Sequence, residues 1–222
     1  ETPESQYYYP RLGMGMLFEK MAERILYLGG TIITRAELKD LIVHDDSVSQ
    51  VVYTHLEKTY SLSTDWLLST MPIHSLLKFL QFDRIPAIQS SLKSMPFRSF
   101  RFLNILLDFP QLSPYTWQYV PNREISFARI QEPKHRSPFL APMNKTSIML
   151  EIPCNKGDEI WNADQKSLFQ RAISELKDLG FDIENHVIDY FCTNAEHGIP
   201  IGMVNIKEHQ QKAYQALRTF KN

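Results

Sequence analysis

Short runs of β-branched, aromatic and aliphatic residues fill the middle of this chain, and turn residues or prolines end each run. The longest extends from Arg98 to Phe109 and stops at Pro110. Strand-type content recurs at 31–34, 41–43, 51–54, 59–62, 66–69, 115–120, 125–130, 147–153 and 186–193. Runs of this length build sheets, and none approaches the roughly 20 apolar residues of a membrane helix. The pattern predicts a mixed or antiparallel sheet, with a small antiparallel meander early in the chain.

Apolar residues at three- and four-residue intervals predict helices beside these strands. One covers residues 16–28 and ends at Gly29, and another begins at Ile73 after a buried strand at 66–69. A third is capped by Asp158 or Asn162 and ends at Gly180, and the last covers 207–220. The predicted fold class is therefore α+β, a sheet with flanking helices.

Charge and cysteine content exclude several kinds of partner. The 24 Lys and Arg residues balance 25 Asp and Glu residues, so no broad positive field attracts nucleic acid or anionic lipid. Cys154 and Cys192 lack the paired spacing of a redox or metal motif, which favours reduced thiols and a cytoplasmic location. The histidines have no acidic partner at metal-ligand spacing, so we expect no metal site.

Gly13 and Gly15 predict a turn that starts a helix. They follow Pro10 and Arg11 instead of a hydrophobic strand, and Phe18 stands where a phosphate-binding fingerprint has its third glycine. We therefore do not interpret them as a phosphate cradle.

Three stretches in a fixed order carry a family resemblance. They are 9–17 (YPRLGMGML), 29–38 (GGTIITRAEL) and 65–72 (DWLLSTMP). This order resembles the middle of the flavin-containing amine oxidase superfamily, which includes protoporphyrinogen oxidase. Further on, 116–121 (TWQYVP) and 127–135 (FARIQEPKH) resemble the substrate domain of the branch related to UDP-galactopyranose mutase.

The resemblance implies a division of the chain and a cofactor. Residues 1–72 would be part of an FAD-binding domain, with a helix, a β-meander and a returning strand, and residues 73–222 would be the substrate-binding domain. The superfamily's G-x-G-x-x-G unit, which receives the FAD pyrophosphate, does not occur here. The chain then resembles the central piece of a larger FAD enzyme. We expect FAD in the full-length parent, with the remainder of the FAD-binding domain as partner, and neither FAD binding nor activity in this piece alone.

The resemblance also implies cofactor-binding positions. Leu38 stands where a strand backbone pairs with the adenine, although a plain strand residue explains it equally well. Thr70, Met71 and Pro72 match a strand end near the adenosine half of FAD, or are simply exposed.

Arg129 is the main substrate-binding candidate. Its planar guanidinium suits a carboxylate or diphosphate, and the mutase-like motif has an arginine there; the alternative is a surface ion pair with Glu132. Lys134 and His135 add positive charge to the motif or belong to a solvated loop without partners.

Aromatic residues are the other substrate-binding candidates. Trp117 and Tyr119 alternate on one face of a predicted strand and either stack on a substrate or belong to the core. The same choice applies to Tyr7, Tyr8 and Tyr9, which could instead line the entrance to the flavin.

No catalytic residue is assigned, because in such enzymes the flavin carries the chemistry and the protein positions the substrate. We expect an oxidoreductase, or a mutase acting through reduced flavin, on an unknown small molecule such as a nucleotide sugar. The alternatives are a binding or assembly domain that has lost its cofactor, and a sugar-binding domain associated with a glycosyltransferase.

Overall fold

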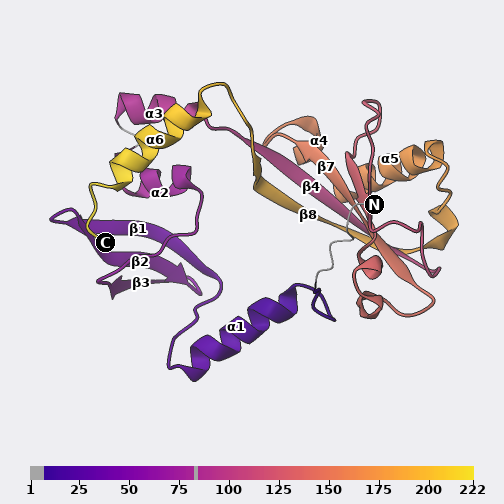
Figure 1. Cartoon of the computed structure of the whole chain (residues 1–222), viewed down its shortest axis with the longest axis horizontal. Coiled ribbons are helices and arrows are strands. Elements are labelled where there is room, and N and C mark those ends of the chain that lie inside the picture. The colour runs from indigo at the N-terminus through magenta and orange to yellow at the C-terminus, as the bar shows by residue number, and fades with distance from the viewer. Residues whose placement is uncertain (1–7, 83–84) are drawn as a thin grey trace, which may run out of the picture. The chain divides into compact units, whose positions relative to one another are not determined.

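A computed structural model describes residues 8–82 and 85–222 of the chain (Figure 1). The chain forms two compact units, each assembled from separate parts of the sequence. Unit 1 contains Glu1–Thr31 and Arg98–Gly198, and unit 2 contains Ile32–Phe97 and Ile199–Asn222. These boundaries do not coincide with the cut at residue 72, and the assignment of 1–72 and 73–222 to cofactor and substrate domains stays a prediction.

Unit 1 is built on a five-stranded sheet in the order β5-β6-β7-β4-β8. Its strands are β4 (Phe97–Leu107), β5 (Trp117–Tyr119), β6 (Arg129–Gln131), β7 (Thr146–Cys154) and β8 (Val187–Pro200). The pairs β5–β6, β6–β7 and β7–β4 are antiparallel. At one end of the β4–β8 pair the Asp108 N–H donates to His186, and at the other the Ile201 N–H donates to Pro96, so these strands are antiparallel too. The predicted antiparallel sheet is confirmed.

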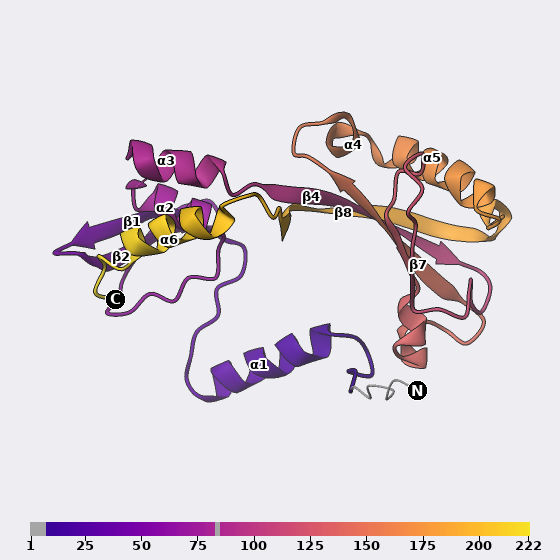
Figure 2. The same cartoon turned by 45° about the horizontal axis from the view of Figure 1, so that its top comes forward.

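Two helices lie on one side of this sheet, α4 (Glu159–Asn162) and α5 (Gln165–Asp178) (Figure 2). The sequence analysis predicted one helix here, but Asp158 and Asp164 each cap a separate helix by accepting a backbone N–H. Two hydrogen bonds from Ser167 lower the pKa of Asp164, because they favour the ionised carboxylate.

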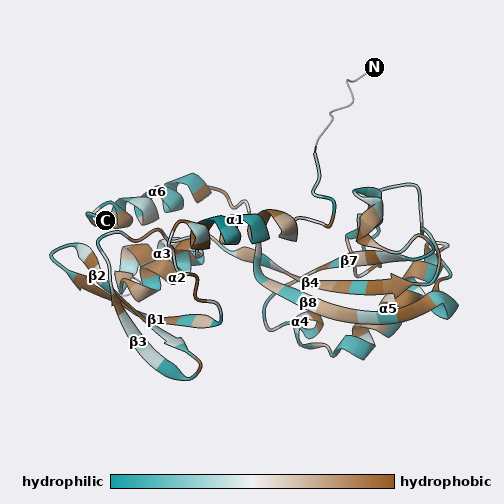
Figure 3. Ribbon diagram, turned by 90° about the horizontal axis from the view of Figure 1, so that it is seen from below, coloured by the Kyte–Doolittle hydropathy of each residue, from teal (hydrophilic) through white to brown (hydrophobic). Residues whose placement is uncertain are grey.

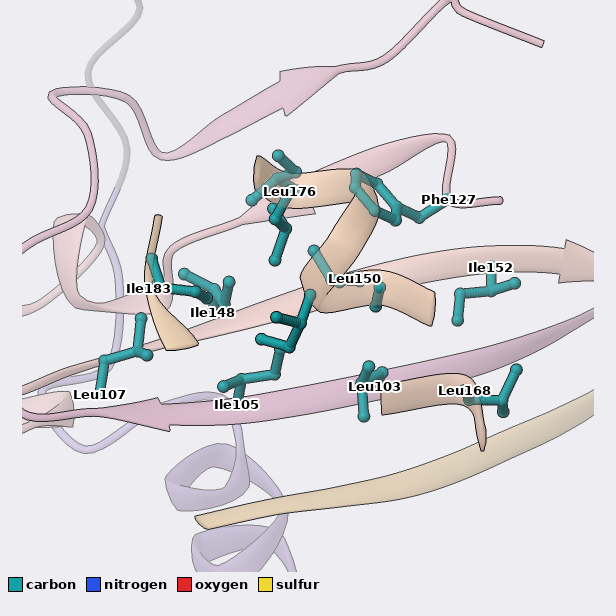
Figure 4. Close-up of a cluster of buried hydrophobic side chains, with 13 residues drawn as sticks. Leu103, Ile105, Leu107, Phe127, Ile148, Leu150, Ile152, Leu168, Leu176 and Ile183 are labelled. Atoms are coloured by element: carbon teal, nitrogen blue, oxygen red, sulfur yellow. The ribbon is translucent and has the colours of Figure 1, made fainter. Parts of the chain in front are cut away.

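The core of unit 1 fills the space between the sheet and α5 (Figure 4). Leu103 of β4, Leu150 of β7 and Leu176 of α5 are each fully buried in it. The β4 ribbon is hydrophobic along most of its length (Figure 3), as the long apolar run at 98–109 predicted.

The start of unit 1 forms the predicted turn and helix α1 (Gly15–Tyr27). Gly13 has φ +95° and donates its N–H to Pro10, a left-handed turn that glycine adopts without a steric penalty. The Arg11 guanidinium lies 4.2 Å from the centre of the Phe139 ring. Tyr8 is exposed and Tyr9 is half-buried, whereas Tyr7 is outside the described residues.

Unit 2 contains the predicted meander, an antiparallel sheet of β1 (Ala36–His44), β2 (Ser47–His55) and β3 (Lys58–Ser63). Positive φ angles at Asp45 and Asp46, and again at Leu56 and Glu57, form the two hairpin turns. The strand predicted at 31–34 is wrong, because these residues form an irregular segment that leads into β1.

The second part of unit 2 is a group of three helices, α2 (Ile73–Phe79), α3 (Pro86–Lys93) and α6 (Ile206–Leu217). Leu77, Ile88 and Ala213 are buried where the helices meet. The Asn222 side chain exchanges two hydrogen bonds with the backbone of Val48 in β2, which attaches the end of the chain to the meander.

The buried strand predicted at 66–69 is wrong. This stretch has no regular structure, and Trp66 and Leu68 are 79% and 92% exposed. A strand needs a neighbour for its backbone hydrogen bonds, and none of the described strands pairs with this segment.

Candidate substrate-binding face

The strand register of unit 1 brings the three predicted substrate residues together. Tyr119 of β5 pairs with Arg129 of β6, which pairs with Glu151 of β7. In the next row Trp117 pairs with Gln131. Residues directly opposite each other in an antiparallel ladder share a face of the sheet.

This face is the one turned away from α5. The intervening residues Ile130 and Leu150 are buried in the core with α5, and side chains alternate between the two faces of a strand. We call it the aromatic face, and it comprises Trp117, Tyr119, Arg129, Gln131, Met149 and Glu151. Trp117 is 46% and Tyr119 70% exposed, so neither belongs to the core.

Arg129 forms its ion pair across the sheet with Glu151. Its Nη2 lies 2.6 Å from Glu151 Oε1, and its guanidinium carbon lies 5.6 Å from the centre of the Tyr119 ring. The hydrogen bond to Glu151 raises the pKa of Arg129, and Gln131 donates a second hydrogen bond to the same carboxylate oxygen. The sequence analysis considered an ion pair between Arg129 and Glu132. This is wrong, because the partner of Arg129 is Glu151. Arg129 Nε is buried and has no acceptor among the described residues, so one donor remains unused.

Arg136 is a further member of this site that the sequence analysis missed. Its Nη2 donates to Gln131 Oε1 at 2.7 Å, and its guanidinium carbon lies 5.8 Å from the centre of the Trp117 ring. Within 8–82 and 85–222 no carboxylate forms an ion pair with it. Two arginines and the single carboxylate of Glu151 leave one uncompensated positive charge at the aromatic face. The only signal in the sequence was its place directly after the 127–135 motif.

Glu132 holds a loop and does not face a substrate. It is 2% exposed and accepts the backbone N–H groups of Leu112 and Ser113 at 2.8 and 3.0 Å. The Thr146 hydroxyl donates to it at 2.7 Å, and His135 Nε2 lies 3.3 Å from its other oxygen. His135 does not belong to a solvated loop without partners, because its Nε2 also lies 2.6 Å from the Ser113 carbonyl oxygen and fixes the loop. That His135 adds positive charge to the motif stays a prediction.

Lys134 has the same structural role. Its ammonium group, with three N–H donors, lies 2.6–3.0 Å from four backbone carbonyl oxygens, those of Pro110, Pro142, Met143 and Lys145. It is neither a solvated side chain without partners nor a free charge for a ligand. The motif at 127–135 thus supplies Arg129 and Gln131 to the aromatic face, and the residues that follow them stabilise neighbouring loops by hydrogen bonds.

The predicted cofactor positions lie in unit 2. Leu38 pairs with Tyr53 and is half-buried on β1, an edge strand that leaves one row of backbone groups unpaired. Thr70 is exposed, Met71 is half-buried, and Pro72 immediately precedes α2. Their contact with a cofactor stays a prediction.

The residues present fit FAD only in part. A free strand edge such as that of β1 can pair with an adenine, but the described residues offer no glycine-rich loop between a strand and a helix for the phosphates. A Cβ at Gly13 would lie 3.3 Å from Leu140, so a leucine side chain fills the space beside that turn. We therefore derive no reaction step through FAD from these residues.

Other reactive groups in the described residues give no second centre. No set of three or more His, Cys, Asp and Glu residues there is arranged to hold a metal. Cys154 and Cys192 are free thiols, and burial raises the pKa of each, which disfavours the reactive thiolate. None of the described helices has the length and apolar character needed to cross a bilayer.

Comparison with known proteins finds similar solved structures but no match by sequence. No protein-family model matches the sequence, and no curated protein does. Among solved structures, reduced UDP-galactopyranose mutase superposes with a TM-score of 0.71 at 20% identity over 94% of this chain. A putative protoporphyrinogen oxidase from Exiguobacterium sp. 255-15 gives a TM-score of 0.74 at 16% identity over 99% of this chain.

The chain has the fold of these proteins. An oxidoreductase from Methanosarcina mazei is also similar, with a TM-score of 0.62 and 15% identity over 83% of this chain and 43% of its own. The fold expected from the resemblance to the flavin amine oxidase superfamily is thereby confirmed. The chain spans 45% of the mutase and 47% of the putative oxidase, so it corresponds to less than half of either protein.

Proposed function

We propose that the aromatic face is the substrate-binding wall of a flavin-dependent oxidoreductase or mutase. The observation that carries this proposal is the row of Tyr119, Arg129 and Glu151 next to the row of Trp117 and Gln131 on one sheet face. Aromatic rings and guanidinium groups side by side are typical of sites for planar or anionic molecules. The shared fold with a mutase and two oxidoreductases supports the same conclusion.

The geometry of the face favours a ligand with a flat group and a negative charge. Trp117 and Tyr119 keep large exposed ring surfaces on which a base or sugar can stack. Glu151 fixes the Arg129 guanidinium in place, and Arg136 contributes the uncompensated charge. A nucleotide sugar combines a flat base with a diphosphate and is the substrate class that we propose.

FAD belongs to this proposal as a cofactor of the complete protein. Leu38, Thr70, Met71 and Pro72 stay our candidates for contact with its adenosine half. Because the described residues lack a phosphate cradle, we expect the 222-residue chain alone to bind FAD weakly or not at all and to show no activity. The free thiols support a reducing, cytoplasmic location.

The cofactor part is tested on the complete gene product. Expressed with riboflavin available, it should purify yellow, with the absorbance of bound FAD. A colourless protein that still bound UDP-galactose would contradict the flavin part and favour a sugar-binding domain. A colourless protein that bound neither would favour an assembly domain.

The substrate part is tested by titrating UDP-galactose into the 222-residue chain. We expect Arg129→Gln to weaken binding about tenfold, since a charge-assisted hydrogen bond contributes about 1.5 kcal/mol or more. Arg123→Gln, an exposed arginine with no ion pair in the described part of the chain, is the matched control. Equal weakening in both variants would mean that non-specific charge, and not this face, attracts the ligand.

A further inference from the structure

Gln131 is a buried amide with charged groups on both sides. It lies on β6 opposite Trp117 of β5, and only 5% of it is exposed. Its Oε1 accepts a hydrogen bond from Arg136 Nη2 at 2.7 Å, and its Nε2 donates one to Glu151 Oε1. The same Glu151 oxygen pairs with Arg129 at 2.6 Å. One amide therefore connects this ion pair to the second arginine of the aromatic face.

Of the common side chains, an amide suits this position because it has a donor and an acceptor at the same end. The Arg136 guanidinium can only donate and the ionised Glu151 carboxylate can only accept, so both ends fix which way the Gln131 amide points. A glutamate here would place two carboxylates in contact, and a methionine would make neither hydrogen bond.

The amide holds Arg136 without neutralising its charge. A carboxylate would also accept a hydrogen bond from this guanidinium, but its negative charge would compensate the positive one. The Glu151 carboxylate compensates Arg129. Glu132 accepts backbone N–H groups of the neighbouring loop and forms no ion pair with either arginine in the described ranges 8–82 and 85–222. A neutral partner thus leaves the Arg136 charge available.

We propose that Gln131 is a positioning residue that makes the aromatic face select ligands with an anionic group. It acts through Arg136, because its own side chain is buried. Arg136 is only half-buried, and its guanidinium carbon lies 5.8 Å from the centre of the exposed Trp117 ring. A ligand that stacks on this ring places an attached anionic group near the charge. The inference rests on the proposed function and adds the residue that selects for the charge of the ligand.

Two probes separate the charge of such a ligand from its flat group. Inorganic pyrophosphate is anionic and has no ring, whereas uridine is flat and neutral. Both are titrated by calorimetry into the 222-residue chain at about pH 8, where carboxylates are ionised. Gln131→Glu introduces a carboxylate next to Arg136 and should weaken pyrophosphate binding about tenfold or more, while uridine affinity should change less than about twofold.

Gln170→Glu is the matched control, because it makes the same change of charge at an exposed position of α5, which covers the other face of the sheet. It should leave both affinities unchanged. Gln131→Met is a second variant that removes both hydrogen bonds and adds no charge. It should weaken pyrophosphate binding by about threefold, less than Gln131→Glu does, because Arg136 keeps its charge and loses only its fixed direction.

Urea unfolding followed by circular dichroism checks that each variant is folded. Should Gln131→Glu fail to fold, the selective loss of pyrophosphate binding in Gln131→Met decides the question. A merely structural role would weaken pyrophosphate and uridine equally in either variant, and that result would overturn the proposal. Undiminished pyrophosphate binding in Gln131→Glu would overturn it too, as would an unaltered chain that does not bind pyrophosphate.

Failure of the proposed function gives a different result. If pyrophosphate responds to the variants as expected but UDP-galactose binds the unaltered chain no more tightly than pyrophosphate does, the role of Gln131 stands and the nucleotide sugar is wrong. If uridine does not bind, stacking on the rings is contradicted, and the pyrophosphate titrations of the folded variants still decide the role of Gln131.

Discussion

The two faces of the sheet in unit 1 come from alternate residues of the same strands, yet they carry different chemistry. On the face under α5, Ile130 and Leu150 are almost completely buried and belong to the hydrophobic core. One residue along, Arg129 and Glu151 form an ion pair beside exposed aromatic rings on the other face. The difference separates the residues that stabilise the sheet from those available to a ligand.

The largest expected effect follows from truncating adjacent residues of β7 that point to opposite faces. Leu150→Ala should lower the free energy of unfolding by about 3 kcal/mol, because it leaves a cavity in a fully buried core. Met149→Ala, on the half-buried aromatic face, should cost about 1 kcal/mol or less. Urea unfolding followed by circular dichroism measures both. Equal losses would mean that the aromatic face is a second core.

A smaller loss of stability is expected when the hydrogen bonds between Glu132 and the loop at Leu112 and Ser113 are weakened. Glu132→Gln replaces one carboxylate oxygen by an amide that cannot accept the N–H of Leu112 or Ser113. We expect a loss of about 2 kcal/mol in the free energy of unfolding, the magnitude for a hydrogen bond to a charged group.

Glu124→Gln is the control for that measurement, because Glu124 is exposed and its side chain forms no hydrogen bond or ion pair in the described part of the chain. It should change stability by less than about 0.5 kcal/mol. If Glu132→Gln changed the free energy of unfolding as little as the control does, Glu132 would not stabilise the loop. Ligand binding would then have to account for the whole 127–135 motif.

Local sequence patterns predicted the elements of the fold where a segment determines its own structure. The long apolar run gave β4, the periodicity gave α1, α5 and α6, and paired turn residues between short β-rich runs gave the meander. Helix α3 was missed because its eight residues, PAIQSSLK, hold few apolar positions to show a period. The strand predicted at 66–69 failed because strand formation depends on a neighbouring strand.

The sequence predicted which residues form the site, but not which residue each of them contacts. Alternation placed Trp117 and Tyr119 on one face, but the register of β6 against β7 decides that Arg129 contacts Glu151 instead of Glu132. Register is set by contacts distant in sequence, so a local pattern does not contain it. For the same reason the sequence could not show that Lys134 and His135 stabilise loops, because most of their partners are distant in sequence.

Removing the exposed ring of Tyr119 should change stability little, and here binding should respond instead. Tyr119→Thr keeps a residue that favours strands and removes the ring next to Arg129, so stability should fall by about 1 kcal/mol or less. Loss of a stacking surface should weaken UDP-galactose binding up to about tenfold. Tyr119→Phe retains the ring and should bind like the unaltered chain in calorimetry. Unchanged binding in Tyr119→Thr would assign this ring to the protein surface, and the contrast between the two faces would then rest on Trp117 and the arginines alone.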